Sequence, residues 1–317
     1  MLTGYLQLKQ NKITIIFNPK ANLGRAWQTE ESLQSCLPDN SHIEWLRTEY
    51  PGQATYIAQT ASESRSHRII AIGGDGTIHE VINGLIKSGK KDLPSLGIVP
   101  VGSGNDFAFS LGISTDPCTA LDQSLTFKGQ PIDIGYVKNS RGEIEYWSNA
   151  VGIGFDAIVV IYTRKMQYLK GFTVYFAAVL RTLFFNHKSF HLEGVIDNKK
   201  FDANLLMLAL CNGQREGGGF YLAPQSEQND GLLDFVMLNY VSKINLLASL
   251  TKFLDGTHTE LSHVDHGQFK SVKILSDQPL IIHTDGEIYA GFDSSIKEVE
   301  IGIIPSAIRA VKIDKQI

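Results

Sequence analysis

The chain has few cysteines, and none of them form a recognisable motif. Cys36, Cys118 and Cys211 lie far apart in the sequence and include no Cys-x-x-Cys pair. An odd and sparse set of this kind fits a reducing compartment. It argues against both a disulfide framework and a zinc site.

Long hydrophobic runs and an excess of positive charge are also missing. The most apolar region, Thr173 to Phe185, is interrupted by Arg181 and is shorter than the roughly 20 residues that span a bilayer. Polar residues 9–12 break any signal-peptide pattern. The net charge is −4, so no global basic field points to nucleic acid. We expect a cytoplasmic protein whose only membrane contact is peripheral, at the inner face.

The length and the order of hydrophobic patterns indicate two domains. The chain has 317 residues, and domains commonly have about 100–150. Before about Pro131, short apolar runs alternate with helix-like segments, which is typical of an α/β sheet. After it, runs such as Asp133–Val137, Glu145–Asn149, Phe190–Ile196 and Leu205–Cys211 predict antiparallel strands.

The most informative stretch is Arg68 to Thr77. Residues 69–72 are apolar and predict a buried strand, and three glycines then form a turn whose backbone can approach a bulky anion. Thr77 is expected to be the N-cap of a helix that buries Ile78, Val81, Ile82, Leu85 and Ile86. A helix N-terminus behind a glycine turn suits phosphate. Asp75 would repel phosphate unless a Mg²⁺ ion lay between them; the alternative is a plain glycine-rich turn with a solvated aspartate.

Two further loops follow predicted strands. Asn18-Pro-Lys-Ala-Asn22 comes after the strand Ile13–Phe17 and precedes a helix expected to reach about Leu37. Gly102-Ser-Gly-Asn-Asp106 comes after the strand Leu96–Val101. Neighbouring parallel strands would bring such loops to one sheet edge. On residue chemistry alone, the first could be an ordinary turn, and Asn105 and Asp106 could be ordinary helix caps.

Together, Gly73-Gly-Asp-Gly-Thr77 and Gly102-Ser-Gly-Asn-Asp106 resemble the catalytic domain of the diacylglycerol kinase family, which is related to sphingosine kinases. NAD kinases share the first motif but lack the second with this spacing. The resemblance implies that ATP is bound, that Asp75 positions the catalytic Mg²⁺, and that Asp106 joins the magnesium-linked network. It assigns the nucleotide site to Asn18, Pro19, Lys20, Ala21, Asn22, Thr48, Gly73, Gly74, Asp75, Gly76, Thr77, Ile78, His79, Glu80 and Ser103. The chain departs from the family in having its first-loop glycine at Gly24 and Ser103 in place of threonine.

Two later motifs also match the family. Asp230-Gly-Leu-Leu-Asp234 resembles a segment that holds a structural Mg²⁺, here through Asp230 and the carbonyls of Glu227 and Leu232; the alternative is a bare Asp-Gly hairpin. Asp285-Gly-Glu287 follows an apolar run, and the resemblance gives it acid–base duty. A kinase acting on an alcohol needs a carboxylate to accept the hydroxyl proton. Asp285 and Glu287 both remain candidates.

Two other segments carry weaker signals. A helical insertion from Phe155 to about Phe185 has a basic and aromatic mix, including Arg164, Lys165, Tyr168, Lys170, Phe172, Tyr175 and Phe176. This mix could face a membrane, but packing of Ile158, Ile161, Leu169 and Val174 onto a sheet is the favoured interpretation. His258, His263 and His266 are expected to lie in a solvated polar linker, not in a metal site.

The sequence therefore predicts an α/β plus all-β protein. An NAD-kinase-like nucleotide-binding domain would comprise residues 1–130 with the tail 297–317, and a β-sandwich lipid domain residues 131–296, with the active site in the cleft between them. The predicted activity is ATP- and Mg²⁺-dependent phosphorylation of a lipid hydroxyl, such as that of diacylglycerol, at a membrane surface. A kinase with a soluble acceptor and a non-enzymatic lipid or nucleotide sensor are the alternatives. Exposed strand edges could also pair two copies into a homodimer.

Overall fold

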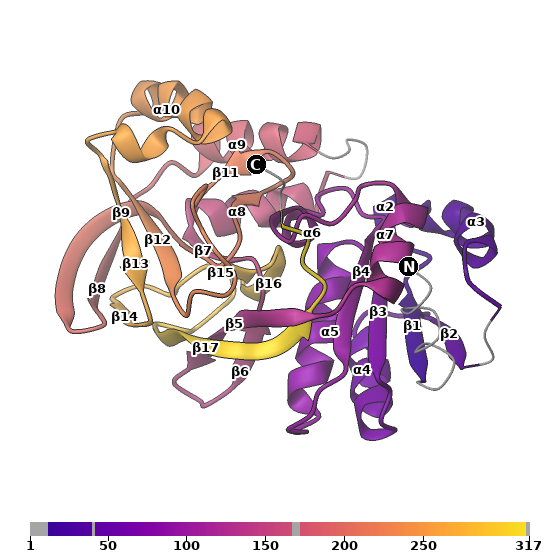
Figure 1. The fold of residues 1–317 in the computed structure, drawn as a ribbon. Coiled ribbons are helices and arrows are strands. Elements are labelled where there is room, and N and C mark those ends of the chain that lie inside the picture. Colours follow the sequence, from indigo (N-terminus) through magenta and orange to yellow (C-terminus); the bar gives the residue numbers. More distant parts are fainter. Residues whose placement is uncertain (1–11, 40–41, 167–171, 315–317) are drawn as a thin grey trace. The chain divides into compact units, whose positions relative to one another are not determined.

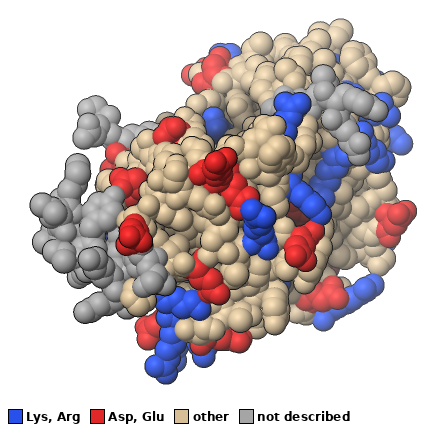
Figure 2. All heavy atoms as spheres, turned by 90° about the vertical axis from the view of Figure 1, so that its right-hand side faces the viewer, with Lys and Arg blue, Asp and Glu red and all other residues tan. Residues whose placement is uncertain are grey.

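The computed structural model describes residues 12–39, 42–166 and 172–314 (Figure 1). The chain divides into two compact units, one of residues 1–132 with 306–317 and the other of residues 133–305. The predicted fold class, an α/β domain followed by a β-sandwich domain, is confirmed. No helix in the described ranges is long and apolar enough to cross a membrane. Figure 2 shows one face of the molecule, on which acidic and basic side chains are interspersed.

The first unit is built on a parallel sheet. Strands β1 (Ile13–Phe17), β2 (Ile43–Arg47), β3 (Arg68–Gly73) and β4 (Ser95–Pro100) lie in the order β2-β1-β3-β4, and the end of β17 (Glu298–Ala310) joins β4. Every residue of β1 and β3 is buried. Continuous apolar runs of this kind are expected when helices cover both faces of a parallel sheet.

Helices follow these strands and close the first unit. They are α4 (Gln53–Glu63), α5 (Asp75–Lys87), α6 (Asp106–Ser110) and α7 (Pro117–Thr126). Helices α4 and α5 pack side by side (Figure 1). Their contact is close because Gly84 lies against the carbonyl of Thr55, where a β-carbon would come within 2.3 Å.

Two sequence-based expectations for the first unit are wrong. The segment after β1 is not one helix but α2 (Ala21–Gly24), a 3₁₀ turn (Ala26–Thr29) and α3 (Glu30–Ser35), because Asn22 and Leu23 adopt left-handed backbone angles with φ of 52° and 56°. Cys36 and Cys118 form a disulfide across 82 residues of sequence. The two cysteines meet because α3 packs against α7, which no sequence spacing reveals.

The second unit is an antiparallel β structure centred on β9 (Lys199–Cys211). The first half of β9 pairs with β8 (Phe190–Ile196), and the second half pairs with β7 (Ala150–Gly154) and β12 (Leu233–Asn239). The burial of its side chains changes accordingly: exposed and half-buried residues alternate in the first half, and every residue of the second half is buried. The remaining strands are β5 (Gln130–Asn139), β6 (Ile144–Trp147), β10 (Arg215–Glu216), β11 (Phe220–Tyr221), β13 (Val264–Phe269), β14 (Ser271–Ser276), β15 (Ile282–Thr284), β16 (Glu287–Ala290) and the first part of β17, which pairs with β14.

Helices α8 (Phe155–Thr163), α9 (Phe172–Phe185) and α10 (Lys243–Asp255) cover one side of the second unit's core. As the favoured interpretation predicted, Ile158 and Ile161 are buried, and Val174 is half-buried. Tyr175 is buried too, so it does not belong to a membrane-facing group. Tyr168, Leu169 and Lys170 lie outside the described residues.

The histidines near residue 260 are not in a solvated linker. His258 is fully buried in a 3₁₀ turn (His258–Glu260), where it stacks on Phe253 at 4.2 Å and hydrogen-bonds the carbonyl of Leu222 at 2.9 Å. His263 contacts the hydroxyl of Ser249 at 2.9 Å, and His266 lies on β13. Within the described ranges, the side-chain groups close enough to share a metal ion include none of these three histidines.

Candidate functional site

The predicted nucleotide-binding residues of the first unit gather at the carboxyl ends of its parallel strands. Phe17 is in register with Arg47 and Ile72, and Gly73 with Pro100, so the four strands end at one edge. The chain runs from β1 outward to β2 and then returns to β3 on the other side of β1. Ligands of open α/β sheets bind at such a reversal of strand order.

The loops after β1 and β3 are joined at that reversal. Nδ2 of Asn18 donates to Oγ1 of Thr77 at 2.9 Å. Asn18 Oδ1 also accepts from the main-chain N–H of Lys20 at 2.9 Å, which shapes the turn through Pro19. The ammonium of Lys20 donates to the carbonyl of Glu49 at 2.6 Å, beside Thr48 at the end of β2. Three of the four loops are therefore connected by hydrogen bonds.

The glycine loops after β3 and β4 touch through their backbones. A β-carbon on Gly74 would lie 3.1 Å from Cα of Gly102, and one on Gly102 would lie 2.4 Å from Cα of Gly74. Residues with side chains could not approach so closely. These glycines are thus required by the contact between the two loops.

Asp75 anchors the second glycine loop. Its carboxylate accepts main-chain N–H groups of Asn105 at 2.7 Å, Asp106 at 2.8 Å and Phe107 at 3.3 Å. These N–H groups belong to the first turn of α6, which has no helical partners for them. Asn105 is held at φ 56° by hydrogen bonds to both main-chain groups of Gly102. Asp75 therefore has a structural task that the sequence did not reveal.

The same two loops offer a donor set that fits a hard cation. A β-carbon on Gly104 would lie 2.9 Å from Oδ2 of Asp75 and 3.2 Å from Oδ2 of Asp106, so both carboxylates border the space that a side chain would fill. Carboxylate oxygens flanking a small space are suitable Mg²⁺ ligands. Asp75 and Asp106 thus fit the ion that the sequence implied.

The other residues predicted for the nucleotide site lie in several different environments. Helix α5 begins at Asp75 with Gly74 as its N-cap, so the expectation that Thr77 is the N-cap is wrong. The side chains of Ile78 and His79 are buried, and the carboxylate of Glu80 accepts the N–H groups of Gly52 and Ala54 at the start of α4. Gly73, Gly76, Ala21, Asn22 and the exposed Ser103 lie in the loops or first turns at the strand ends.

In the second unit, Asp285 and Gly286 form a two-residue turn between β15 and β16, with φ of 51° and 79°. Two positive φ angles are typical of a type I′ hairpin turn. The Asp285 carboxylate accepts N–H groups of Ser148 at 2.8 Å, Asn149 at 2.7 Å and Ala150 at 3.1 Å. Asp285 is therefore buried and holds the chain that enters β7.

Glu287 lies in a different environment. Its Oε2 is 2.5 Å from Nη2 of Arg164, and each side chain is 42% exposed. The same Arg164 nitrogen donates to the carbonyl of Gly286 at 2.9 Å. Of the two candidate bases, Glu287 is thus the one whose carboxylate reaches the surface.

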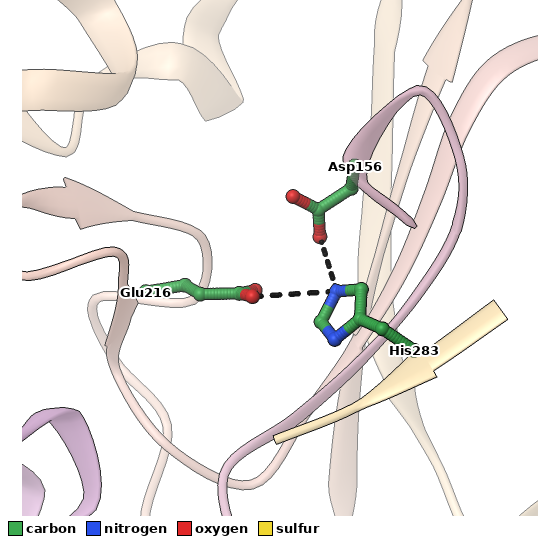
Figure 3. Close-up of side chains that lie close together, drawn as sticks. All are labelled: Asp156, Glu216 and His283. Carbon is green, nitrogen blue, oxygen red and sulfur yellow. Dashed lines mark hydrogen bonds and ion pairs between the residues drawn. The ribbon is translucent and has the colours of Figure 1, made fainter. Parts of the chain in front are cut away.

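A buried group of ionisable side chains lies next to this turn (Figure 3). Nε2 of His283 is 3.0 Å from Oδ2 of Asp156 and 3.3 Å from Oε1 of Glu216, and the hydroxyl of Tyr175 donates to Oδ1 of Asp156 at 2.7 Å. Burial works against ionised Asp156, but the imidazole of His283 and these hydrogen bonds outweigh it, so the pKa of Asp156 lies below its ordinary value. Sequence reasoning missed this group. The signal was a histidine inside the apolar run before Asp285.

The hydrogen bonds of His283 oppose a metal ion there. Its Nδ1 accepts the main-chain N–H of Gly286 at 3.2 Å, so the proton is on Nε2, which faces the two carboxylates. A metal-bound histidine does the reverse, donating from its second nitrogen. Asp156, Glu216 and His283 therefore form a hydrogen-bonded network.

The predicted structural magnesium residues lie in a turn before β12. Oδ1 of Asp230 accepts the N–H of Leu232 at 2.9 Å, and Glu227 is exposed. Burial raises the pKa of Asp234, and the charge of Asp230 adds to the effect. The exposed carboxylate of Asp230 supplies one oxygen donor of the predicted set. The turn is not a bare hairpin, because β11 and β12 do not pair with each other.

Comparisons with known proteins agree with both units. The family model of the diacylglycerol kinase catalytic domain matches residues 12–137, and that of the YegS C-terminal NAD kinase beta sandwich-like domain matches residues 149–312. The diacylglycerol kinase of Bacillus subtilis (strain 168) is 30% identical over 87% of this chain and 89% of its own. That of Staphylococcus saprophyticus is 30% identical over 89% and 90%.

A solved structure shows the same fold. The crystal structure of a diacylglycerol kinase from Bacillus anthracis str. Sterne superposes with a TM-score of 0.70 at 21% identity, covering 97% of this chain and 98% of that one. These matches place the protein in the class of kinases, which are enzymes that transfer a phosphoryl group. Within it, the chain belongs to the family of diacylglycerol kinases and YegS-like lipid kinases.

Proposed function

We propose that this protein transfers the γ-phosphoryl group of ATP to the hydroxyl of a lipid such as diacylglycerol, in phospholipid metabolism. The observation that supports this most directly is the meeting of the loops after β1, β3 and β4 where the strand order reverses. Relatives that match nearly the whole chain are named diacylglycerol kinases.

The first unit would bind the nucleotide. Main-chain groups of the glycine loops and the segment Asn18–Asn22 would surround the phosphates, with Thr48 and Ser103 supplying hydroxyls. A Mg²⁺ ion held by Asp75 and Asp106 would neutralise phosphate charge when bound. Asp75 would act in two ways, because it also fixes the loop that carries Asp106. Phosphoryl transfer depends mainly on such positioning and charge neutralisation.

The second unit would supply the base. As the acceptor oxygen forms its bond to the γ-phosphorus and the bond to the β-phosphate oxygen breaks, the hydroxyl proton must be accepted. Glu287 is the better candidate, since its carboxylate is exposed, while that of Asp285 accepts three main-chain N–H groups. The Asp230 turn would hold a second, structural Mg²⁺.

A phosphorylation assay tests the proposal. The protein is incubated with γ-labelled ATP, Mg²⁺ and, separately, micellar diacylglycerol, phosphatidylglycerol, a sphingoid base and soluble NAD. We expect label in one lipid and none in NAD. Label in NAD without detergent would favour the soluble-acceptor alternative, and no label in any acceptor would favour a sensor.

Asp75→Asn is the variant of choice for the nucleotide site. The amide oxygen still accepts main-chain N–H groups, but the negative charge is lost. We expect transfer to fall by about a hundredfold or more while the protein stays folded. Asp122→Asn, on the exposed side of α7, is the matched control. Unchanged turnover in Asp75→Asn would remove Asp75 as a magnesium ligand.

A further inference from the structure

Two helices of the second unit expose an unusual set of large apolar side chains. Phe184 and Phe185 end α9 and are 59% and 72% exposed, and Tyr240, Ile244 and Leu247 precede or begin α10 with exposures of 55%, 79% and 47%. We refer to these five residues as the α9–α10 apolar face. They belong to surface-exposed ends of elements whose other sides are well packed, so their exposure calls for a physical explanation.

Two contacts join the two halves of this face. The ammonium of Lys243 donates to the carbonyl of Phe184 at 2.8 Å, and the rings of His187 and Tyr240 lie 5.2 Å apart. Ile244 and Leu247 are three residues apart in α10, so they share one helix face. The end of α9 and the start of α10 therefore form one continuous surface.

The apolar face is not needed for the fold of the second unit. Helix α9 packs into the core through Ala178, Val179 and Leu183, and α10 packs through Leu246, Leu250 and Phe253. None of the five residues of the apolar face belongs to this buried cluster. A purely structural role would not select phenylalanine and isoleucine there.

Positive charge surrounds this face, and negative charge is missing from its segments. Arg181, Lys188 and Lys243 are exposed. None of the three forms an ion pair with a described residue; the guanidinium of Arg181 instead lies 4.7 Å from the ring centroid of Tyr162 and 5.6 Å from that of Phe185. Residues 172–189 and 240–254 contain no aspartate or glutamate. The two segments of the apolar face therefore carry positive charges only, and the nearest carboxylate in the described contacts is that of Asp265, which accepts from Nδ2 of Asn239 at 2.7 Å.

We propose that the α9–α10 apolar face docks on an anionic lipid membrane. Aromatic and aliphatic side chains would enter the interface between headgroups and acyl chains, while Arg181, Lys188 and Lys243 would meet the lipid phosphates. This binding surface is separate from the residues that we propose to bind ATP and to act as the base. It concerns how the protein reaches a bilayer and does not depend on which hydroxyl is phosphorylated.

Charge distinguishes a membrane from a second copy of the chain. A two-fold contact places the same patch on both sides, so it would bring the cations of one copy against those of the other. No carboxylate in the two segments could neutralise them. An anionic bilayer offers the complementary charge and a hydrocarbon layer for Phe185 and Ile244 at once.

Vesicle flotation tests the proposal with the full chain. Vesicles of phosphatidylcholine alone are compared with vesicles containing about 30 mol% phosphatidylglycerol, at about 0.1 M and about 1 M NaCl. We expect binding to the anionic vesicles, much weaker binding to the neutral ones, and partial loss at high salt. Equal binding to both vesicle types, or none to either, would overturn the proposal.

Variants with matched controls locate the surface. Lys188→Gln with Lys243→Gln should weaken binding roughly tenfold or more, and Phe185→Ser with Ile244→Ser should do the same. Controls on exposed strands of the same unit, Lys199→Gln with Lys200→Gln and Leu275→Ser, should bind as the wild type does. Equal binding by both test pairs and the wild type would place the contact elsewhere.

Two further measurements keep this inference apart from the proposed function. Kinase activity on a short-chain, micellar acceptor should be unchanged in the four surface variants, so a failed activity assay and a failed vesicle assay have different meanings. Sedimentation equilibrium should give the same mass for the wild type and for Phe185→Ser with Ile244→Ser, because the face is not expected to join two copies. A dimer that Phe185→Ser with Ile244→Ser dissociates would show that the face binds a second copy instead of a membrane.

Discussion

Oε2 of Glu287 lies 2.5 Å from Nη2 of Arg164, and the pair holds the glutamate carboxylate at the surface of the second unit. Two residues earlier, Asp285 directs its carboxylate into the protein, toward the N–H groups of Ser148, Asn149 and Ala150. The same short motif thus contains one acid that is accessible and one that is structural. This difference decides which variants are informative.

Glu287→Gln should abolish most phosphoryl transfer without loss of stability. If Glu287 accepts the hydroxyl proton, kcat should fall by about 10²- to 10⁴-fold with little change in KM for ATP. The side chain is half-exposed, so the melting temperature should stay within about 2 °C of the wild type. Steady-state kinetics and calorimetry measure both, with Glu298→Gln as the control. A kcat within a few-fold of wild type would exclude Glu287 as the base.

Asp285→Ala should destabilise the protein. The substitution leaves three main-chain N–H groups in the buried entry to β7 without their acceptor and places alanine at φ 51°, which we expect to cost about 3 kcal/mol or more. Asp285→Asn should cost less, because asparagine tolerates this backbone angle and keeps one acceptor oxygen. Urea unfolding gives both values, with the exposed Asp293→Asn as a control. Equal stability of all four proteins would contradict the anchoring role.

His283→Phe should also be costly, because it removes the hydrogen-bond donor that two buried carboxyl groups share. Removing the imidazole leaves Asp156 and Glu216 buried together, which we expect to cost about 3 kcal/mol or more. Adding Asp156→Asn and Glu216→Gln should recover part of the loss, because a buried neutral amide costs less free energy than a buried unpaired carboxylate. A cycle of single and combined variants measures this coupling. Additive effects would mean that the network contributes nothing as a unit.

Stability should decrease as the pH falls below about 6.5, partly because of His258. Burial lowers the pKa of His258, and its hydrogen bond to the carbonyl of Leu222 offsets only part of that shift. Between the ordinary value and the lower folded value, the unfolded chain binds a proton that the folded chain does not, so folding loses free energy as pH falls. His258→Gln should reduce the difference in unfolding free energy between pH 7.5 and pH 5.5. His42→Gln, at an exposed position, should leave it unchanged.

Magnesium should stabilise the turn before β12. An ion bound only by the folded state should raise the melting temperature by about 2–5 °C at millimolar Mg²⁺. Asp230→Asn should remove the magnesium-dependent part of this rise, whereas Asp277→Asn, an exposed control on the same unit, should retain it. A melting curve that neither Mg²⁺ nor a chelator shifts would count against a structural ion at Asp230.

The sequence by itself determined the parts that depend on local pattern. Apolar runs ending in glycine predicted β3 and β4, alternating runs predicted the antiparallel second unit, and the order of motifs led to the lipid kinase family. These features are visible locally because strands, turns and glycine loops need particular residues at fixed, short spacings.

Only the tertiary structure decided which side chains meet across long separations. It paired Cys36 with Cys118, turned Asp75 and Asp285 into anchors for main-chain N–H groups, and enclosed His283 between Asp156 and Glu216. The partners in these contacts are 30 to 137 residues apart, from Asp75–Asn105 to Ser148–Asp285. The packing of whole elements sets such distances. For the same reason, the sequence could name two candidate bases, and only the fold showed that Asp285 accepts main-chain N–H groups while Glu287 pairs with Arg164 at the surface.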